Sequence, residues 1–187
     1  MIVRNKGYKN GNVKVVFELS KADLEGFDAV ISAFAAWTPE TFGLHKKVAK
    51  HLADALSGTK TRLLVVGGAG TLYVDDKGTM AMDAPDFPSE YMGVAKATAE
   101  SFFELKGRTD VLWTYVSPAG DYDANGARTG KYNLGGDNLI LNSKKRELHQ
   151  LRRPSACGHR RAKKRRLRAK TLYRRGREGV SLKFCVI

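Results

Sequence analysis

The chain has 187 residues and a formal net charge of +14. This length suits one domain with an appendage. No apolar run approaches the length of a membrane span or of a signal-peptide core. We therefore expect a cytoplasmic protein that has no membrane partner.

The charge is unevenly distributed along the chain. Residues 1–143 carry 16 Lys and Arg against 17 Asp and Glu, whereas residues 144–187 carry 17 against 2. Both cysteines also lie in the second segment, and Cys157 with His159 lacks the further ligands of a zinc site. The sequence predicts a globular domain over 1–143, a basic and disordered tail over 144–187, and no metal site.

The first half of the domain alternates between strand and helix patterns. The segment "MIVR" reads as a strand, as do residues 13–19, and residues 20–26 read as a short helix that ends at Gly26. Residues 27–34 form an apolar run typical of a buried strand. Residues 38–58 are expected to be a helix with Thr38 as its cap, because Val48, Leu52 and Leu56 repeat on one face.

The same alternation continues in the second half. A buried strand over 62–70 enters a glycine-rich bend, a helix follows over 89–107, and another buried strand covers 110–120. Strands that alternate with helices and are apolar on both faces indicate a parallel sheet covered on both sides. The predicted fold class is a doubly wound α/β domain, in which ligands bind at the carboxyl ends of the strands.

Several segments carry a resemblance to a known family. They are "IVRN", "GFDAVISAF", "TRLLVVGGAGTLYVD", "DAPDFPSEY" and "WTYVSPAGDYDANGARTGKYNLGGDNLILNS". Together they resemble the NAD(P)H-binding proteins of the atypical short-chain dehydrogenase/reductase type, often labelled NAD-dependent epimerase/dehydratase or NADH-flavin-reductase-like. The resemblance runs from residue 2 to 143. It implies a Rossmann-like fold, NADP or NAD as cofactor, a small-molecule substrate of unknown identity, and oxidoreductase-like activity.

The resemblance also implies which residues bind the cofactor. Arg4 matches the basic residue that contacts the 2′-phosphate of NADP, which suits the chemistry of arginine; a solvated loop arginine is the alternative. Three further groups match the backbone that passes the cofactor, although the glycines could equally form a tight turn. These groups are Ser32, Ala33 and Phe34, then Gly67, Gly68 and Ala69, and finally Ser117, Pro118 and Ala119.

No catalytic residue is assigned. The extended members of the family use a Tyr and a Lys four residues apart on a helix, but Tyr91 and Lys96 are five apart. That spacing separates them by about 140° around the helix, so they would not face one site. Thr71 and Tyr73 lie near the place of a proton donor, and we interpret them as residues that shape the loop.

Two departures from the family lead to further expectations. The family begins with a strand, a glycine-rich GxxGxxG turn and a helix that hold the pyrophosphate, whereas Met1 of this chain falls inside the family's second strand. In the family's usual strand order the first strand is central, so we expect the strands that neighbour it to lack a partner here. We also expect the dinucleotide to be bound weakly, and whether the chain is an active enzyme stays open.

The second departure is the segment from Lys145 onward. Codons that could encode this segment also encode the family's usual ending when they are read one nucleotide out of frame. We therefore interpret this tail as frame-shifted translation.

Two other functions remain as alternatives. A tail with this charge would bind polyanions non-specifically, so the chain could be a basic-tailed nucleic-acid-binding protein. It contains no groove-reading motif, however, and we expect no specific nucleic-acid partner. The second alternative is a cofactor-binding regulator that has no catalytic turnover.

Overall fold

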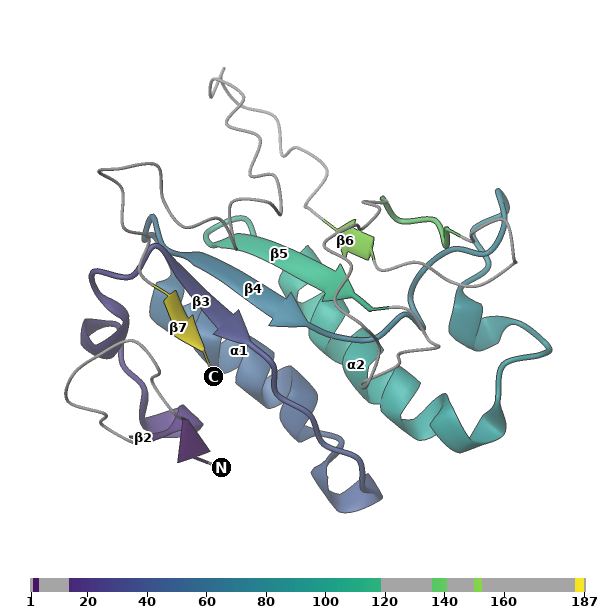
Figure 1. The fold of residues 1–187 in the computed structure, drawn as a ribbon, viewed down its shortest axis with the longest axis horizontal. Coiled ribbons are helices and arrows are strands. Elements are labelled where there is room, and N and C mark those ends of the chain that lie inside the picture. The colour runs from purple at the N-terminus through teal and green to yellow at the C-terminus, as the bar shows by residue number, and fades with distance from the viewer. Residues whose placement is uncertain (1, 4–13, 119–135, 141–149, 153–183, 187) are drawn as a thin grey trace, which may run out of the picture.

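The computed structural model describes residues 2–3, 14–118, 136–140, 150–152 and 184–186. Its main feature is a five-stranded sheet in the order β6-β5-β4-β3-β7 (Figure 1). The strands are β3 (Ala29–Ser32), β4 (Arg62–Val66), β5 (Leu112–Ser117), β6 (Gln150–Arg152) and β7 (Phe184–Val186). Four of them are parallel, and β6 runs antiparallel to β5. The predicted α/β class with a parallel sheet is confirmed.

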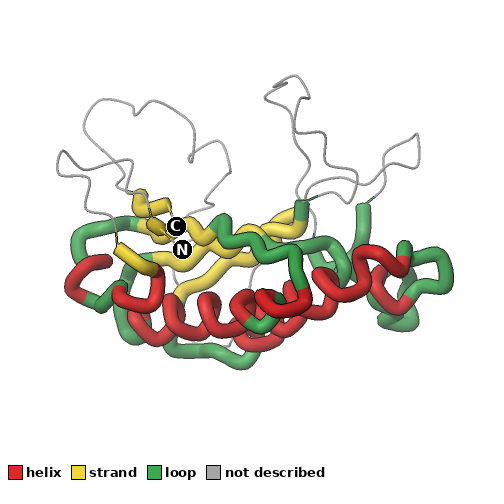
Figure 2. The backbone as a smooth tube through the Cα atoms, turned by 90° about the horizontal axis from the view of Figure 1, so that it is seen from below, coloured by secondary structure: helices red, strands yellow, loops and turns green. Residues whose placement is uncertain are grey.

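Two helices connect the central strands and cover the sheet. Helix α1 (Leu44–Leu56) joins β3 to β4, and α2 (Met92–Lys106) joins β4 to β5. Figure 2 shows the strands as one layer and both helices as a second layer on the same side. Successive crossovers of one hand that move along a sheet in one direction lie on the same face. Helices on the other face, which the sequence also predicts, are not seen among the described residues.

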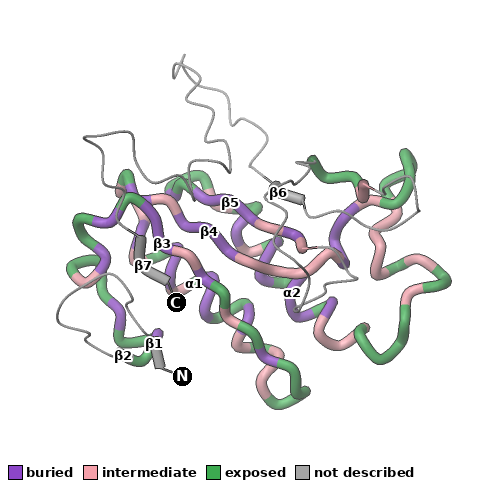
Figure 3. The backbone as a smooth tube through the Cα atoms, in the orientation of Figure 1, coloured by how far each residue is buried: buried purple, intermediate pink, exposed green. Residues whose placement is uncertain are grey.

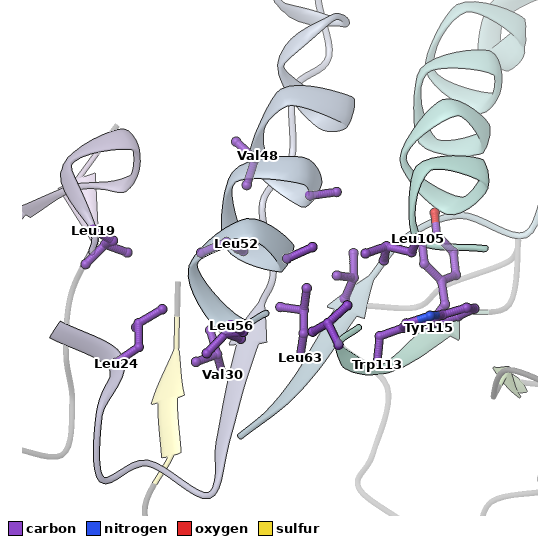
Figure 4. Packing of buried hydrophobic residues seen from close by; sticks show 14 of the residues in the cluster. Leu19, Leu24, Val30, Val48, Leu52, Leu56, Leu63, Leu105, Trp113 and Tyr115 are labelled. Carbon is purple, nitrogen blue, oxygen red and sulfur yellow. The ribbon is translucent and has the colours of Figure 1, made fainter. Parts of the chain in front are cut away.

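The core lies between this helical layer and the sheet (Figures 3 and 4). As predicted, the α1 residues Val48, Leu52 and Leu56 are buried. They contribute to one cluster with the inward side chains of the strands, which include Val30, Leu63, Val65, Trp113 and Tyr115. Each fully buried side chain of this size contributes about 1.5–3 kcal/mol, so the α1 stripe alone is a large part of what holds the helix to the sheet.

Short 3₁₀ turns precede both helices and replace some predicted elements. They cover Val16–Glu18, Ala22–Leu24, Pro39–Thr41, Ala81–Asp83 and Ser89–Tyr91. The described helices do not combine the length and apolar composition that a membrane crossing requires.

The predicted strand over 13–19 is wrong for most of its length. Only β2 (Lys14–Val15) is extended, and a 3₁₀ turn follows it. Val16 and Leu19 are buried while Phe17 is exposed, so the apolar residues follow a helical spacing rather than a strand alternation. Strand β2 pairs antiparallel with β1 (Ile2–Val3) in a separate two-stranded sheet.

The outer edge of β3, which we expected to lack a partner, is paired. Strand β7 runs parallel to it, with Phe184 opposite Ala29 and Val186 opposite Ile31. Strand β6 lies against the other edge of the sheet, next to β5. Six residues of the segment predicted to be a disordered tail therefore belong to the sheet. The apolar run at 184–186 satisfies backbone groups that an exposed edge would leave unpaired.

Candidate functional site at the carboxyl edge of the sheet

The carboxyl ends of β3, β4 and β5 lie side by side, as their arrowheads show in Figure 1. The register places Ser32 opposite Val65 and Val66 opposite Val116. The segments that leave these three strands are the predicted cofactor-binding segments. The structure therefore brings Ser32–Phe34, Gly67–Ala69 and Ser117–Pro118 to one edge, while Arg4 and Ala119 lie outside the described residues.

The segment after β3 is held by a histidine of α1. The Nε2 atom of His45 lies 3.3 Å from the backbone nitrogen of Ala36 and 3.0 Å from its carbonyl oxygen. The His45 ring also makes an edge contact with the Phe34 ring, with 5.1 Å between the ring centres. His45 is buried, so it anchors the loop from inside. His45 is not among the residues predicted for the site, although its position in the first turn of α1, just after this loop, is a usable signal.

The glycines after β4 are explained by packing inside the chain. A Cβ atom at Gly67 would overlap the hydroxyl of Tyr115, and one at Gly68 would lie 2.9 Å from the Thr98 Oγ1. The Gly67 amide donates to the Val116 carbonyl at 2.9 Å, which joins the bend to β5. These two positions need glycine because side chains of β5 and α2 fill the adjacent space. The absence of a side chain there is thus no sign by itself of room for a cofactor.

A polar network lies beneath this bend. The Tyr115 hydroxyl donates to the Thr98 carbonyl at 2.9 Å and lies 3.4 Å from the Ser101 Oγ. The Ser101 hydroxyl also donates to the Thr98 carbonyl, at 2.7 Å. Tyr115 is completely buried. It serves the packing of α2 on the sheet and has no access to a substrate.

Ser117 is a buried polar residue at this edge whose side chain has no hydrogen-bond partner among the described residues. Its side chain is 0% exposed, and its Oγ has no hydrogen-bond partner within the described part of the chain. Burying a hydroxyl without a hydrogen bond costs roughly 1–3 kcal/mol. The half-buried Pro118 follows it. A hydroxyl of this kind at the end of a strand is suited to donate a hydrogen bond to a bound ligand or to accept one from it.

A hairpin-like loop rises from the glycine bend. Tyr73 pairs with Met80 across it, and the amide of Met82 donates to the carbonyl of Gly70 at 2.9 Å. The backbone of Tyr73 is also bonded to Asp137 and Leu139. Tyr73 therefore shapes this loop, as predicted, and the buried Thr71 lies at its base.

The tip of the loop is an acidic turn. The Asp75 Oδ1 accepts the amides of Lys77 and Thr79, both at 2.9 Å. The pKa of Asp75 is lowered, first by the side-chain hydroxyl of Thr79 and then by these backbone amides. The carboxylate is thus held in its charged form and stabilises the turn by accepting these two amides.

The remaining sequence candidates do not meet at this edge as a catalytic pair. Tyr91 precedes α2 and Lys96 lies on its exposed side. Among the described residues, no cluster of three or more His, Cys, Asp or Glu is placed to hold a metal ion.

Known proteins resemble the chain over much of its length. No protein-family model matches it. The chain is 46% identical over 133 residues to the uncharacterized protein YwnB of Bacillus subtilis, a match that covers 70% of the chain and 62% of YwnB. The chain thus spans less than two thirds of that relative.

Two solved structures share the fold. One, from Streptococcus pneumoniae and described as "a putative NADH-flavin reductase", is 44% identical, with a TM-score of 0.70 over 80% of this chain and 72% of that one. The other, described as a "putative epimerase" from Bacteroides thetaiotaomicron, is 26% identical, with a TM-score of 0.59 over 78% and 76% of the two chains. The parallel sheet and the similarity to these proteins lead to the same family. The chain belongs to the NAD(P)-binding, Rossmann-like proteins of the atypical short-chain dehydrogenase/reductase type.

Proposed function

We propose that the chain binds a nicotinamide dinucleotide at the carboxyl edge of β3, β4 and β5 and acts as an oxidoreductase on a small-molecule substrate. The observation that carries the proposal is the meeting of Ser32–Phe34, Gly67–Ala69 and Ser117–Pro118 at that edge. Open parallel sheets bind ligands there. The similarity to a protein described as a reductase of flavin supports the reaction class.

The residues of this edge have separable roles in the proposal. The exposed Ala33 leaves the end of β3 open to a ligand, and the buried Ser117 hydroxyl supplies a hydrogen-bonding atom at the end of β5. His45 of α1 holds the segment that follows β3 through the backbone of Ala36. A bound nicotinamide supplies the hydride.

A charge placed at this edge tests the location of the cofactor. In Ala33→Glu a carboxylate would face the phosphates of a dinucleotide, so we expect its Kd for NADH and NADPH to rise at least tenfold, equal to about 1.4 kcal/mol. Leu112→Glu adds the same charge at a half-exposed position at the amino end of β5 and should change Kd less than twofold. Calorimetric titration of both variants measures this. Equal losses in the two variants, or no binding by the wild-type chain, would refute the proposed site.

Turnover distinguishes an oxidoreductase from a regulator that only binds the cofactor. We expect the wild-type chain to oxidise NADH or NADPH when a flavin is offered as acceptor, measured by the loss of reduced cofactor absorbance. Binding without any turnover over a panel of flavin and quinone acceptors would favour the regulator.

A further inference from the structure

Trp37 is a large apolar side chain exposed next to the candidate site. It is 69% exposed and follows the carboxyl end of β3 by five residues. The chain's second tryptophan, Trp113, is only 2% exposed and lies in the core. Packing against the described residues therefore does not account for a tryptophan at this position beside the candidate site.

The backbone before Trp37 presents alternate side chains to opposite sides. Ala33, Ala35 and Trp37 are exposed, whereas Phe34 and Ala36 are turned inward and at least partly buried. This alternation is that of an extended chain, in which every second side chain points to one side about 6–7 Å from the last. The outward side is therefore a shelf of two small alanines bounded by one large ring.

The backbone on both sides of Trp37 is fixed. On one side, the Nε2 of His45 contacts both the backbone nitrogen and the carbonyl oxygen of Ala36. On the other side, Thr38 and Thr41 form a capping box, in which the Thr38 amide donates to the Thr41 Oγ1 at 3.4 Å. Little backbone freedom would be lost when a ligand contacts the ring, which favours binding.

We propose that Trp37 and the Ala33–Ala35 shelf form a stacking site for a planar heteroaromatic ring. A flat ring lies over side chains as small as alanine and places its face or edge against the indole. The ring is either the adenine of the dinucleotide or the isoalloxazine of a flavin substrate. Both candidates come from the proposed function, so this part of the proposal rests on it. The two sources share their chemistry and differ in size and attached groups.

Separate titrations with AMP and with riboflavin test the site. We expect the wild-type chain to bind at least one of them with quenching of tryptophan fluorescence, after correction for absorbance with free tryptophan. Trp37→Ala should raise the calorimetric Kd for that probe at least fivefold, because aromatic stacking of one base is of this strength or greater. Trp37→Phe retains a ring and should stay within threefold of the wild type; its residual fluorescence comes from the buried Trp113 and should not respond.

Phe103→Ala is the matched control. Phe103 is an exposed aromatic residue near the carboxyl end of α2, which leads into the amino end of β5 and is thus far from the carboxyl ends of the strands. Its loss should leave both affinities unchanged. Loss of AMP affinity alone in Trp37→Ala identifies the adenine, and loss of riboflavin affinity alone identifies the flavin. Equal binding of both probes by wild type and Trp37→Ala, or binding of neither probe by the wild type, overturns the stacking site.

The same variants separate this proposal from the proposed function. If riboflavin binds in a Trp37-dependent manner while NADH and NADPH do not bind at all, the stacking site stands and the cofactor proposal fails. If NADH binds equally to wild type and Trp37→Ala and neither probe depends on Trp37, the stacking site fails and the cofactor proposal stands.

Discussion

The side chain of Tyr115 occupies the space in which a side chain at Gly67 would have to lie. Tyr115 lies on β5 and Gly67 directly follows the neighbouring parallel strand β4, and the Tyr115 hydroxyl donates to the Thr98 carbonyl of α2. The bend after β4 can pass over β5 only because position 67 has no Cβ. The close approach of the bend to the sheet and the anchoring of α2 are thus parts of one packing arrangement.

Gly67→Ala should destabilise the fold. The added methyl group must displace a fully buried ring that is hydrogen-bonded at its far end, and overpacking of this kind costs roughly 1–3 kcal/mol. Thermal unfolding should show a melting temperature lower by several degrees. Gly43→Ala is the control, because a Cβ there meets nothing within 4 Å and its φ is −61°. A Gly67→Ala protein as stable as Gly43→Ala would contradict this packing.

The role of Gly67 illustrates what the sequence could and could not predict. A run of glycines after an apolar strand indicates a bend, and such a bend is compatible with either a tight turn or a close approach to a cofactor. The contact that requires glycine comes from Tyr115, which is distant in sequence, and no local pattern reports it. The α1 stripe of Val48, Leu52 and Leu56 was predicted correctly because its period is local.

Ser117→Ala should separate stability from ligand binding. Removing a buried hydroxyl that has no partner in the described part of the chain should leave stability unchanged or raise it by about 1 kcal/mol. If that hydroxyl serves the cofactor, the Kd for NADH should rise several-fold at the same time. Unfolding curves and calorimetric titration measure the two effects. A destabilised variant with unchanged affinity would show that the hydroxyl has a structural partner instead.

Arg108 should make stability depend on pH in the acidic range. It donates to Asp110 at 2.7 Å and also bonds Asp54 of α1. The pKa of Asp110 is lowered, first by its hydrogen bond to Arg108, and that of Asp54 is lowered first by Lys50 and then by Arg108. Because the folded pKa values lie below the unfolded value of about 3.9, the stabilisation is present above that pH and is lost as the pH falls through the lowered values.

Arg108→Met should therefore lose less stability than the wild type when the pH is lowered from 4 to 2. Melting temperatures across this range measure the difference, and Lys96→Met, which removes an exposed charge from α2, serves as the control. The expected effect is small because these carboxylates are largely solvent-exposed. Parallel curves for wild type and Arg108→Met would rule out the proposed linkage.

Arg4 should decide between NADP and NAD. The resemblance places this residue beside the 2′-phosphate, and a guanidinium pairs with a phosphate far better than with a ribose hydroxyl. Arg4→Ala should raise the Kd for NADPH at least tenfold and that for NADH less than twofold. Parallel titrations measure both values, with Lys6→Ala as a control for general loss of positive charge. An equal change for the two cofactors would remove Arg4 from the phosphate.

Strand β7 shows why charge density alone does not predict which residues of a segment are ordered. The segment 144–187 was predicted to be disordered because of its high density of Lys and Arg, yet its apolar residues 184–186 lie in register beside β3. A three-residue strand has too little pattern of its own to be recognised. The pairing gives hydrogen-bond partners to backbone groups on the outer edge of β3, which is a tertiary effect that the local sequence does not reveal.

Cys185→Pro tests this pairing directly. Cys185 lies opposite Val30 in the parallel ladder, and proline has no amide hydrogen and does not fit within a paired strand. The lost ladder contacts should cost roughly 1–3 kcal/mol, which lowers the melting temperature of a domain of this size by several degrees. Cys185→Val removes the same thiol but keeps the amide and favours a strand, so it should melt with the wild type. Hydrogen exchange adds a second readout, because backbone amides of β3 such as that of Val30 should exchange faster in Cys185→Pro alone. If proline and valine at position 185 give the same melting temperature and the same exchange in β3, the segment 184–186 does not hold the edge of the sheet in solution.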